Sequence, residues 1–281
     1  MERIAVVTDS TSDLPPGLAR QYGIHIIPLS VVFEGKKYID DGKSIKLGDF
    51  YRKLKASRNM PMAAQPSPGD FMRLYSRLLK DHDNIISIHI SGKLSGTYNS
   101  AALAKKQLGH PGIEVVDSGF VHMACGFMAM EAARLASNSS DAGEILRRIK
   151  AFRANIWSLY CPFTLDNLIK GGRMNKLAGA FAGMLEVKPV LTIKDGEVSL
   201  FKKARKWEQA KDVMISAIKD AASGSDSLVI SVADVDARKE ADSISGRIRD
   251  ELKPRELIRT EVGIVVGSHL GIGGLGITCH L

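Results

Sequence analysis

Short runs of β-branched and aliphatic residues alternate with longer amphipathic segments through the first half of the chain. Such runs occur at Arg3 to Thr8, Ile85 to Ile90 and Gly112 to Asp117, and they are typical of strands buried in a parallel sheet. Segments with helical periodicity lie between and after them: 44–58, 68–82, 97–108, 121–137 and 141–153. Because parallel strands need long crossover connections, this alternation predicts an α/β domain with a mainly parallel sheet and flanking helices.

The second half of the chain has a different pattern. Asp195 and Gly196 separate two extended runs, which predicts a two-residue β-hairpin. Helices are expected near 207–222 and 237–252, and strands over 227–233 and 256–266. With 281 residues the chain has room for two modest domains. We expect an N-terminal α/β domain over 1–158 and a C-terminal domain with a mixed α+β sheet over 159–281.

Two prolines mark local breaks near the N-terminus. Pro28 interrupts an extended segment from Gly23 to Phe33 and predicts an edge strand or a bulge there. Pro15 follows closely on Asp13, which is a candidate cap for a helix that begins at this point.

The net charge of +8 is compatible with a nucleic-acid or anionic partner. The basic residues do not form one tract, however, and aromatic residues make up only 6% of the chain. They are not interleaved with the densest basic clusters, which argues against a stacking platform for single strands. We therefore interpret the basic clusters as solvated faces and expect no nucleic-acid partner.

Cysteine usage and hydropathy bear on the compartment. The three cysteines, Cys125, Cys161 and Cys279, are widely spaced, and this favours reduced thiols in a cytoplasmic protein over a disulfide framework or a zinc site. The seven histidines are scattered, so we expect no metal site. The longest apolar-looking stretch, 119–136, contains charged residues and does not read as a membrane span.

A loop rich in Ser, Gly and Lys joins the run Ile85 to Ile90 to the predicted helix that starts at Thr97. Such a junction exposes unpaired helix N–H groups, and hydroxyls there add further donors, so Ser95 could bind a carboxylate or a phosphate. Ser95 or Thr97 could equally be an ordinary helix cap. The usual nucleotide-binding glycine motifs and the GxSxG motif are absent.

Three other places carry candidate functional residues. The stretch TDSTSD, 8–13, sets Asp9 and Ser10 after a strand, where a carboxylate could bind a metal or accept a proton, or serve only as turn chemistry. Arg173 follows paired glycines, a geometry useful for anions. His269 follows a predicted strand and precedes glycines, which is where α/β proteins bind ligands.

Taken together and in order, several motifs resemble those of the DegV family of bacterial lipid-binding proteins. They span the whole chain: TDSTSDLP from Thr8, QPSPGDF from Gln65, ISGKLSGTYNSA from Ile90, VVDS from Val115, LIKGGRM from Leu168, KPVLTIKDG from Lys188, KKARKWEQA from Lys202 and VGIVVGSHLGIGGLG from Val262.

The resemblance implies two α/β domains that enclose a long-chain, palmitate-like fatty acid, without a metal or other cofactor. It implies a carrier and not an enzyme, one that serves lipid transport or fatty acid metabolism by presenting the acid to a separate fatty acid kinase. The carboxylate contacts it implies are Ser95 in the LSGT loop, together with Gly96 and Thr97, and Arg173 and His269 near the head group.

The chain departs from the family pattern at Ala63 and Ala64, where the family usually has Thr-Ser. Ala63 has no hydroxyl, and the loss of one hydrogen bond costs about 0.5–1.5 kcal/mol net, so we expect weaker binding or a different ligand. Segments 120–130 and 174–185, rich in Met, Phe, Ala and Gly, are candidate tunnel walls or ordinary core. The alternative function is a hydrolase or phosphatase that uses Asp9 and Ser10, or Ser95 as nucleophile.

Overall fold

The structure, a computed structural model, describes residues 3–138, 141–174, 187–222, 225 and 227–281. Its first sheet has four strands in the order β2-β1-β6-β7, and all neighbouring pairs are parallel. The strands are β1 (Ile4–Asp9), β2 (Ile24–Ile27), β6 (Asn84–His89) and β7 (Ile113–Asp117). The parallel α/β architecture predicted for the first half of the chain is confirmed.

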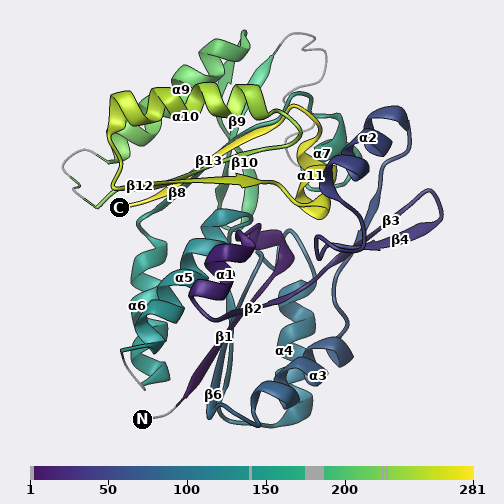
Figure 1. Cartoon of the computed structure of the whole chain (residues 1–281), viewed down its shortest axis with the longest axis vertical. Coiled ribbons are helices and arrows are strands. Elements are labelled where there is room, and N and C mark those ends of the chain that lie inside the picture. Colours follow the sequence, from purple (N-terminus) through teal and green to yellow (C-terminus); the bar gives the residue numbers. More distant parts are fainter. Residues whose placement is uncertain (1–2, 139–140, 175–186, 223–224, 226) are drawn as a thin grey trace.

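Helices cover both faces of this sheet (Figure 1). On one face lie α1 (Pro16–Gln21), α5 (Met123–Ala136) and α6 (Ala142–Arg153), and on the other lie α3 (Pro68–Leu78) and α4 (Thr97–Leu108). Helix α5 is buried along nearly its whole length because it packs on β1 and β6 and also touches β13 and β8 of the second sheet. It therefore belongs to the core that the two halves share.

The second sheet has six strands in the order β10-β9-β8-β13-β11-β12. They are β8 (Ile156–Cys161), β9 (Lys188–Lys194), β10 (Glu197–Ala204), β11 (Val229–Asp234), β12 (Glu256–Glu261) and β13 (Leu275–His280). Only β11 and β12 pair in parallel, so the predicted mixed sheet is confirmed. Helices α9 (Trp207–Ala221) and α10 (Arg238–Leu252) cover its outer face (Figure 1).

The hairpin between β9 and β10 turns at the predicted residues. Asp195 has a φ of 51° and Gly196 a φ of 80°, the positive values that a tight two-residue hairpin requires. The division of the chain after residue 158 stays a prediction; that position falls within β8.

A small third sheet, ordered β4-β3-β5, stands beside the other two (Figure 1). It comprises β3 (Ser30–Phe33), β4 (Lys36–Ile39) and β5 (Met62–Ala64), with α2 (Leu47–Ala56) between the last two. The predicted interruption at Pro28 is confirmed: β2 is an edge strand of the first sheet, and after Pro28 the chain enters the third sheet. Pro28 has no N–H to continue the ladder, and the next N–H, that of Leu29, donates to Ser10 Oγ at 3.0 Å.

The expected strand over 256–266 is wrong in its last part. Strand β12 ends at Glu261, and a short helix, α11 (Ile264–Leu270), begins three residues later. Its first N–H groups are satisfied by aspartates from the other half of the chain: Gly263 N–H donates to Asp13 and Ile264 N–H to Asp40. Asp13 thus does not cap α1, whose N-cap is Pro15 without a side-chain bond.

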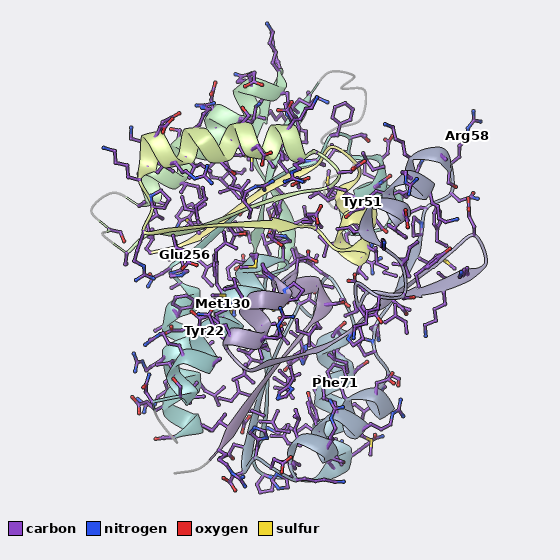
Figure 2. All side chains as sticks on the ribbon, viewed as in Figure 1. Tyr22, Tyr51, Arg58, Phe71, Met130 and Glu256 are labelled. Carbon is purple, nitrogen blue, oxygen red and sulfur yellow. The ribbon has the colours of Figure 1, made fainter. Side chains whose placement is uncertain are left out.

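The side chains fill the space between these layers (Figure 2). The hydrophobic cluster around α5 takes in Val229 and Ile258 from the second sheet, so the two large sheets share a core. Among the described residues, no helix has the length and apolar character needed to cross a membrane.

Candidate ligand-binding cavity

A cavity lies where the carboxyl end of β6, the β9–β10 hairpin, α11 and the small third sheet meet. Its empty space is about 830 Å³ with the mouth toward solvent included. Its described polar lining residues are Thr11, Gln65, Ser95, Arg173 and His269. The rest of that lining is aliphatic or aromatic: Leu29, Ala63, Ile90, Leu94, Val121, Tyr160, Leu168, Leu191, Ile193, Val198, Val265, Val266 and Leu270. Such a wall suits a ligand with a long apolar part and a small polar end.

Ser95 lies in the turn before α4 and lines the cavity. Its Oγ accepts the N–H of Thr97 at 3.3 Å and lies 2.9 Å from Thr97 Oγ1. When the Thr97 hydroxyl donates to Ser95, the Ser95 proton is free to donate to an anion in the cavity. The N-cap of α4 is Gly96 and not Ser95 or Thr97, but the bond that Ser95 Oγ accepts from the first helix N–H is compatible with a ligand contact. Thr97 is buried behind Ser95 and does not line the cavity.

Gly96 occupies the N-cap position of α4 and does not line the cavity. A Cβ at Gly96 would lie 2.4 Å from Gln65 Nε2, so only glycine lets the Gln65 amide lie against this turn. Gln65 and Thr11 line the cavity beside Ser95, and the sequence did not mark them as ligand contacts. The sequence feature that could have indicated Gln65 as a ligand contact was its position as the first residue of the QPSPGDF motif.

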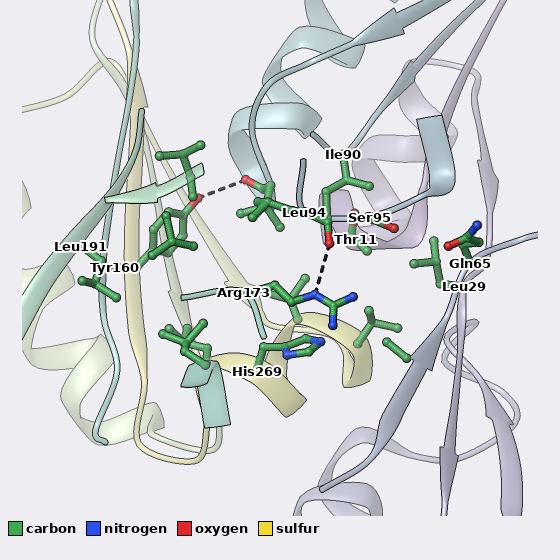
Figure 3. A pocket seen from close by; sticks show the side chains of 18 residues that line it. Thr11, Leu29, Gln65, Ile90, Leu94, Ser95, Tyr160, Arg173, Leu191 and His269 are labelled. Carbon is green, nitrogen blue, oxygen red and sulfur yellow. Dashed lines mark hydrogen bonds between the residues drawn. The ribbon is translucent and has the colours of Figure 1, made fainter. Parts of the chain in front are cut away.

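Arg173 is held by main-chain carbonyls inside the cavity (Figure 3). Its Nε donates to Leu94 O at 3.2 Å and its Nη1 to Gly171 O at 2.6 Å. These bonds use two of the five guanidinium N–H donors. Arg173 is thus fixed next to the Ser95 loop, and its remaining donors are suited to an anionic group.

His269 lies in the last turn of α11 and not after a strand, which corrects the expected placement. Burial, and then the charge of Arg173, lowers its pKa to about 4, so the ring is neutral at pH 7. Its Nδ1 is buried and has no hydrogen-bond partner among the described residues. A Cβ at Gly171 would lie 2.4 Å from that nitrogen, so glycine is needed for the ring to fit.

Ala63 on β5 lines the cavity, as expected, and offers it no hydroxyl. Of the first candidate tunnel segment, 120–130, Val121 lines the cavity, whereas 123–130 is buried in the core around α5. Of the second, 174–185, Met174 packs in the core, and 175–185 lie outside the described residues.

Asp9, which with Ser10 or Ser95 would serve the enzyme alternative, is fully buried and accepts several hydrogen bonds. Its oxygens accept from Thr11 N–H and Oγ1–H, from Ile90 N–H, and pair with His89 Nδ1 at 2.9 Å. His89 Nε2 in turn lies 2.6 Å from Ser87 Oγ. Asp9, His89 and Ser87 are thus hydrogen-bonded in the same sequence as the Asp, His and Ser of a hydrolase triad. All three side chains are buried and none lines the cavity, so the arrangement fits a structural role. Among the described residues, no group of His, Cys, Asp and Glu could hold a metal ion.

The two sheets and the cavity define a class: α/β proteins that enclose a mostly apolar ligand site with a few convergent polar groups. A family model described as "Uncharacterised protein, DegV family" matches residues 3–280. The chain belongs to the DegV family.

Known members of this family resemble the chain over its whole length. A DegV domain-containing protein of Caldanaerobacter subterraneus is 34% identical over 99% of this chain and 98% of its own. The solved structure of DegV from Bacillus subtilis, described as a fatty acid binding protein, superimposes with a TM-score of 0.93 at 31% identity and covers 100% of both chains. A Thermus thermophilus family member, described by its fatty acid binding, gives 0.92 at 33% identity over 99% of both chains.

Proposed function

We propose that this protein binds a long-chain, palmitate-like fatty acid in the cavity, with the carboxylate at Ser95, Arg173 and His269. The single observation that carries the proposal is that these three side chains, far apart in the sequence, line one cavity whose remaining walls are mostly apolar. The fatty acid binding described for the relatives from Bacillus subtilis and Thermus thermophilus supports it.

The chemistry of the cavity suits an amphiphile. Burial of an acyl chain contributes about 0.8 kcal/mol per CH₂ group, which over a long chain outweighs an association cost of about 4–15 kcal/mol. The carboxylate must exchange its water for donors, because a buried charge without partners is costly. Arg173 supplies the charge and Ser95 a hydroxyl, with Thr97 and Gly96 shaping the loop around Ser95.

The test is native mass spectrometry of the purified protein, before and after removal of lipid and addition of palmitate. We expect one bound fatty acid molecule per protein molecule. Ser95→Ala should weaken palmitate binding by about 2- to 12-fold, because one hydrogen bond is worth about 0.5–1.5 kcal/mol. Ser76→Ala, on the exposed side of α3, is the matched control and should bind like the wild type. A lipid-free protein that takes up no palmitate contradicts the proposal.

We further propose that the protein is a cytoplasmic carrier and not an enzyme. In this role it presents the bound carboxylate to a separate fatty acid kinase. Two observations support the carrier role over a hydrolase or phosphatase. Asp9 is buried and does not line the cavity, and the side-chain hydrogen bonds of Ser95 among the described residues go to Thr97, which is no general base.

A further inference from the structure

Two carboxyl groups from the first part of the chain meet where α11 begins. Gly263 N–H donates to Asp13 Oδ1 at 2.8 Å, and Ile264 N–H donates to Asp40 Oδ1 at 3.2 Å. Asp13 follows a short 3₁₀ turn, η1 (Ser10–Ser12), and Asp40 follows β4. More than two hundred residues separate each aspartate from its partner along the chain. The pair therefore ties the N-terminal half of the chain to α11.

The two carboxyl groups are near neighbours, pressed against the backbone of Gly263. A Cβ on Gly263 would lie 2.6 Å from Asp13 Oδ1 and 3.0 Å from Asp40 Oδ1. Their other oxygens, Oδ2 of each, are buried and accept no hydrogen bond from the described residues. Two ionised carboxylates so placed repel each other in a site that also disfavours each charge by itself.

The described groups that act most strongly on the pair carry no positive charge. His122 Nε2 lies 3.5 Å from Asp13 Oδ2, but burial lowers the His122 pKa to about 3, so this ring is neutral. Asp9 from β1 acts on both carboxyl groups, and Asp41 acts on Asp40. Tyr51 from α2 lies near the pair; Asp234 at the end of β11 and Glu261 at the end of β12 lie near Tyr51, and Asp234 is paired with Arg259 at 3.0 Å. Tyr51, labelled in Figure 2, anchors the same turn by donating to Val262 O.

These surroundings act on the protonation of the pair. Burial, with a further contribution from the neighbouring Asp40, raises the pKa of Asp13 well above its ordinary value. Burial also raises the pKa of Asp40 to about 6, although hydrogen bonds from Ser10 and Ile264 oppose the shift. Both shifts favour the protonated carboxyl groups, and Asp40 gains its proton as the pH falls through about 6.

Helix α11 connects this pair to the cavity. Four of its seven residues line the cavity: Val265, Val266, His269 and Leu270. Neither aspartate lines the cavity itself. A change in how firmly the start of α11 is held thus acts on four lining side chains at once.

We propose that Asp13 and Asp40 together form a protonation-dependent latch that positions α11 and makes retention of the bound fatty acid depend on pH. This inference rests on the proposed function. The folded pKa of Asp40, about 6, lies above the about 3.9 of an exposed aspartate. Its stabilising contribution is therefore fully present below about pH 4 and is lost as the pH rises through about 6. The start of α11 is held most firmly when Asp40 is protonated. The bound fatty acid should therefore dissociate faster at pH 7.5 than at pH 5.5.

The experiment compares the wild type with Asp40→Asn, which keeps an acceptor for Ile264 N–H and cannot ionise. Each full-length protein is loaded with labelled palmitate, and the rate of its transfer to serum albumin is measured at pH 5.5 and 7.5. The ratio of the wild-type rate to the Asp40→Asn rate should rise by about threefold or more between these pH values. Titration of palmitate and of His269 affects both proteins and cancels in the ratio. Asp49→Asn, an exposed aspartate on α2, is the matched control and should track the wild type.

A ratio that is the same at both pH values overturns the latch. Failure of the wild type to bind palmitate at either pH overturns the proposed function instead, and with it the lipid part of the inference. Thermal unfolding of the lipid-free proteins tests the latch without palmitate. The unfolding temperature of Asp40→Asn relative to that of the wild type should rise with pH. A difference that stays constant with pH refutes titration of Asp40.

If Asp40→Asn does not fold, Ser10→Ala takes its place. The Ser10 hydroxyl lowers the pKa of Asp40, so its removal should move the midpoint of the wild-type pH profile to higher pH. An unchanged midpoint overturns the latch.

Discussion

At the scale of residues, the cavity combines residues that local sequence rules assign to turns and helix caps. Ser95 follows the pattern of a capping residue, and its Oγ does accept a helix N–H, yet it also lines the cavity. Gly96 and Gly171 are each needed because a neighbouring side chain, Gln65 or His269, occupies the space of a Cβ. The identity of each of these residues is therefore restricted both by the local backbone and by the side chains that line the cavity.

Ala63 offers a direct test of the polar end of the cavity. Ala63→Thr restores a hydroxyl on β5, where a β-branched residue is well tolerated. Palmitate affinity should increase by about 2- to 12-fold, the equivalent of one hydrogen bond of about 0.5–1.5 kcal/mol. Isothermal titration calorimetry provides the measurement.

The next residue serves as the control for this substitution. Side chains alternate along a strand, and Ala64 does not line the cavity, so Ala64→Thr should leave affinity unchanged. Equal effects of the two substitutions would mean that position 63 does not contact the carboxylate.

At the scale of elements, the predicted helices and strands mostly form where periodicity placed them. Helix α4 occupies the expected residues, and the β9–β10 hairpin turns at Asp195 and Gly196. The changes of chain direction that local patterns did not specify have a common cause. At Pro28 and at 262–264 the chain changes direction because side chains distant in sequence, Ser10 in one case and Asp13 and Asp40 in the other, bind its main-chain N–H groups.

The hairpin gives a prediction about stability. Gly196 has a φ of 80°, and a Cβ there would lie 2.7 Å from Ser91 Oγ, the group that donates to Gly196 O. Gly196→Ala should therefore lower the free energy of unfolding by at least about 1 kcal/mol. Urea denaturation measures this change.

Gly246, inside helix α10, is the matched control for the hairpin substitution. It has no atom within 4 Å of a Cβ position. Gly246→Ala should raise the free energy of unfolding by up to about 1 kcal/mol through helix propensity. A Gly196→Ala protein as stable as the wild type would show that the hairpin adapts without cost.

At the scale of the whole molecule, the cavity exists only because three sheets meet around it. The first sheet contributes Ile90 and the Ser95 loop, the second contributes Leu191, Ile193 and Val198, and the third contributes Ala63. The aliphatic wall thus comes from all three sheets, and no one part of the chain could form the cavity by itself.

The carrier role predicts a division of labour. The purified protein loaded with palmitate should not hydrolyse ATP or form acyl phosphate alone. Addition of a fatty acid kinase should give acyl phosphate, detected by trapping with hydroxylamine, and Ser95→Ala should reduce its yield. The kinase with free palmitate and no carrier is the control. Acyl phosphate made by the carrier alone would contradict the proposal and identify it as an enzyme.

The sequence by itself determined the fold class, most element positions and the β9–β10 hairpin. It also indicated Ser95, Arg173 and His269 as candidates, and the family resemblance added Ala63. Periodicity and turn chemistry are local properties, and burial of one face is enough to select helix or strand. Only the tertiary structure decided that His269 lies on a helix, that Gln65 and Thr11 line the same cavity, and that Asp13 and Asp40 hold the start of that helix. Those features depend on hydrogen bonds and packing between residues distant in sequence, which no local pattern encodes.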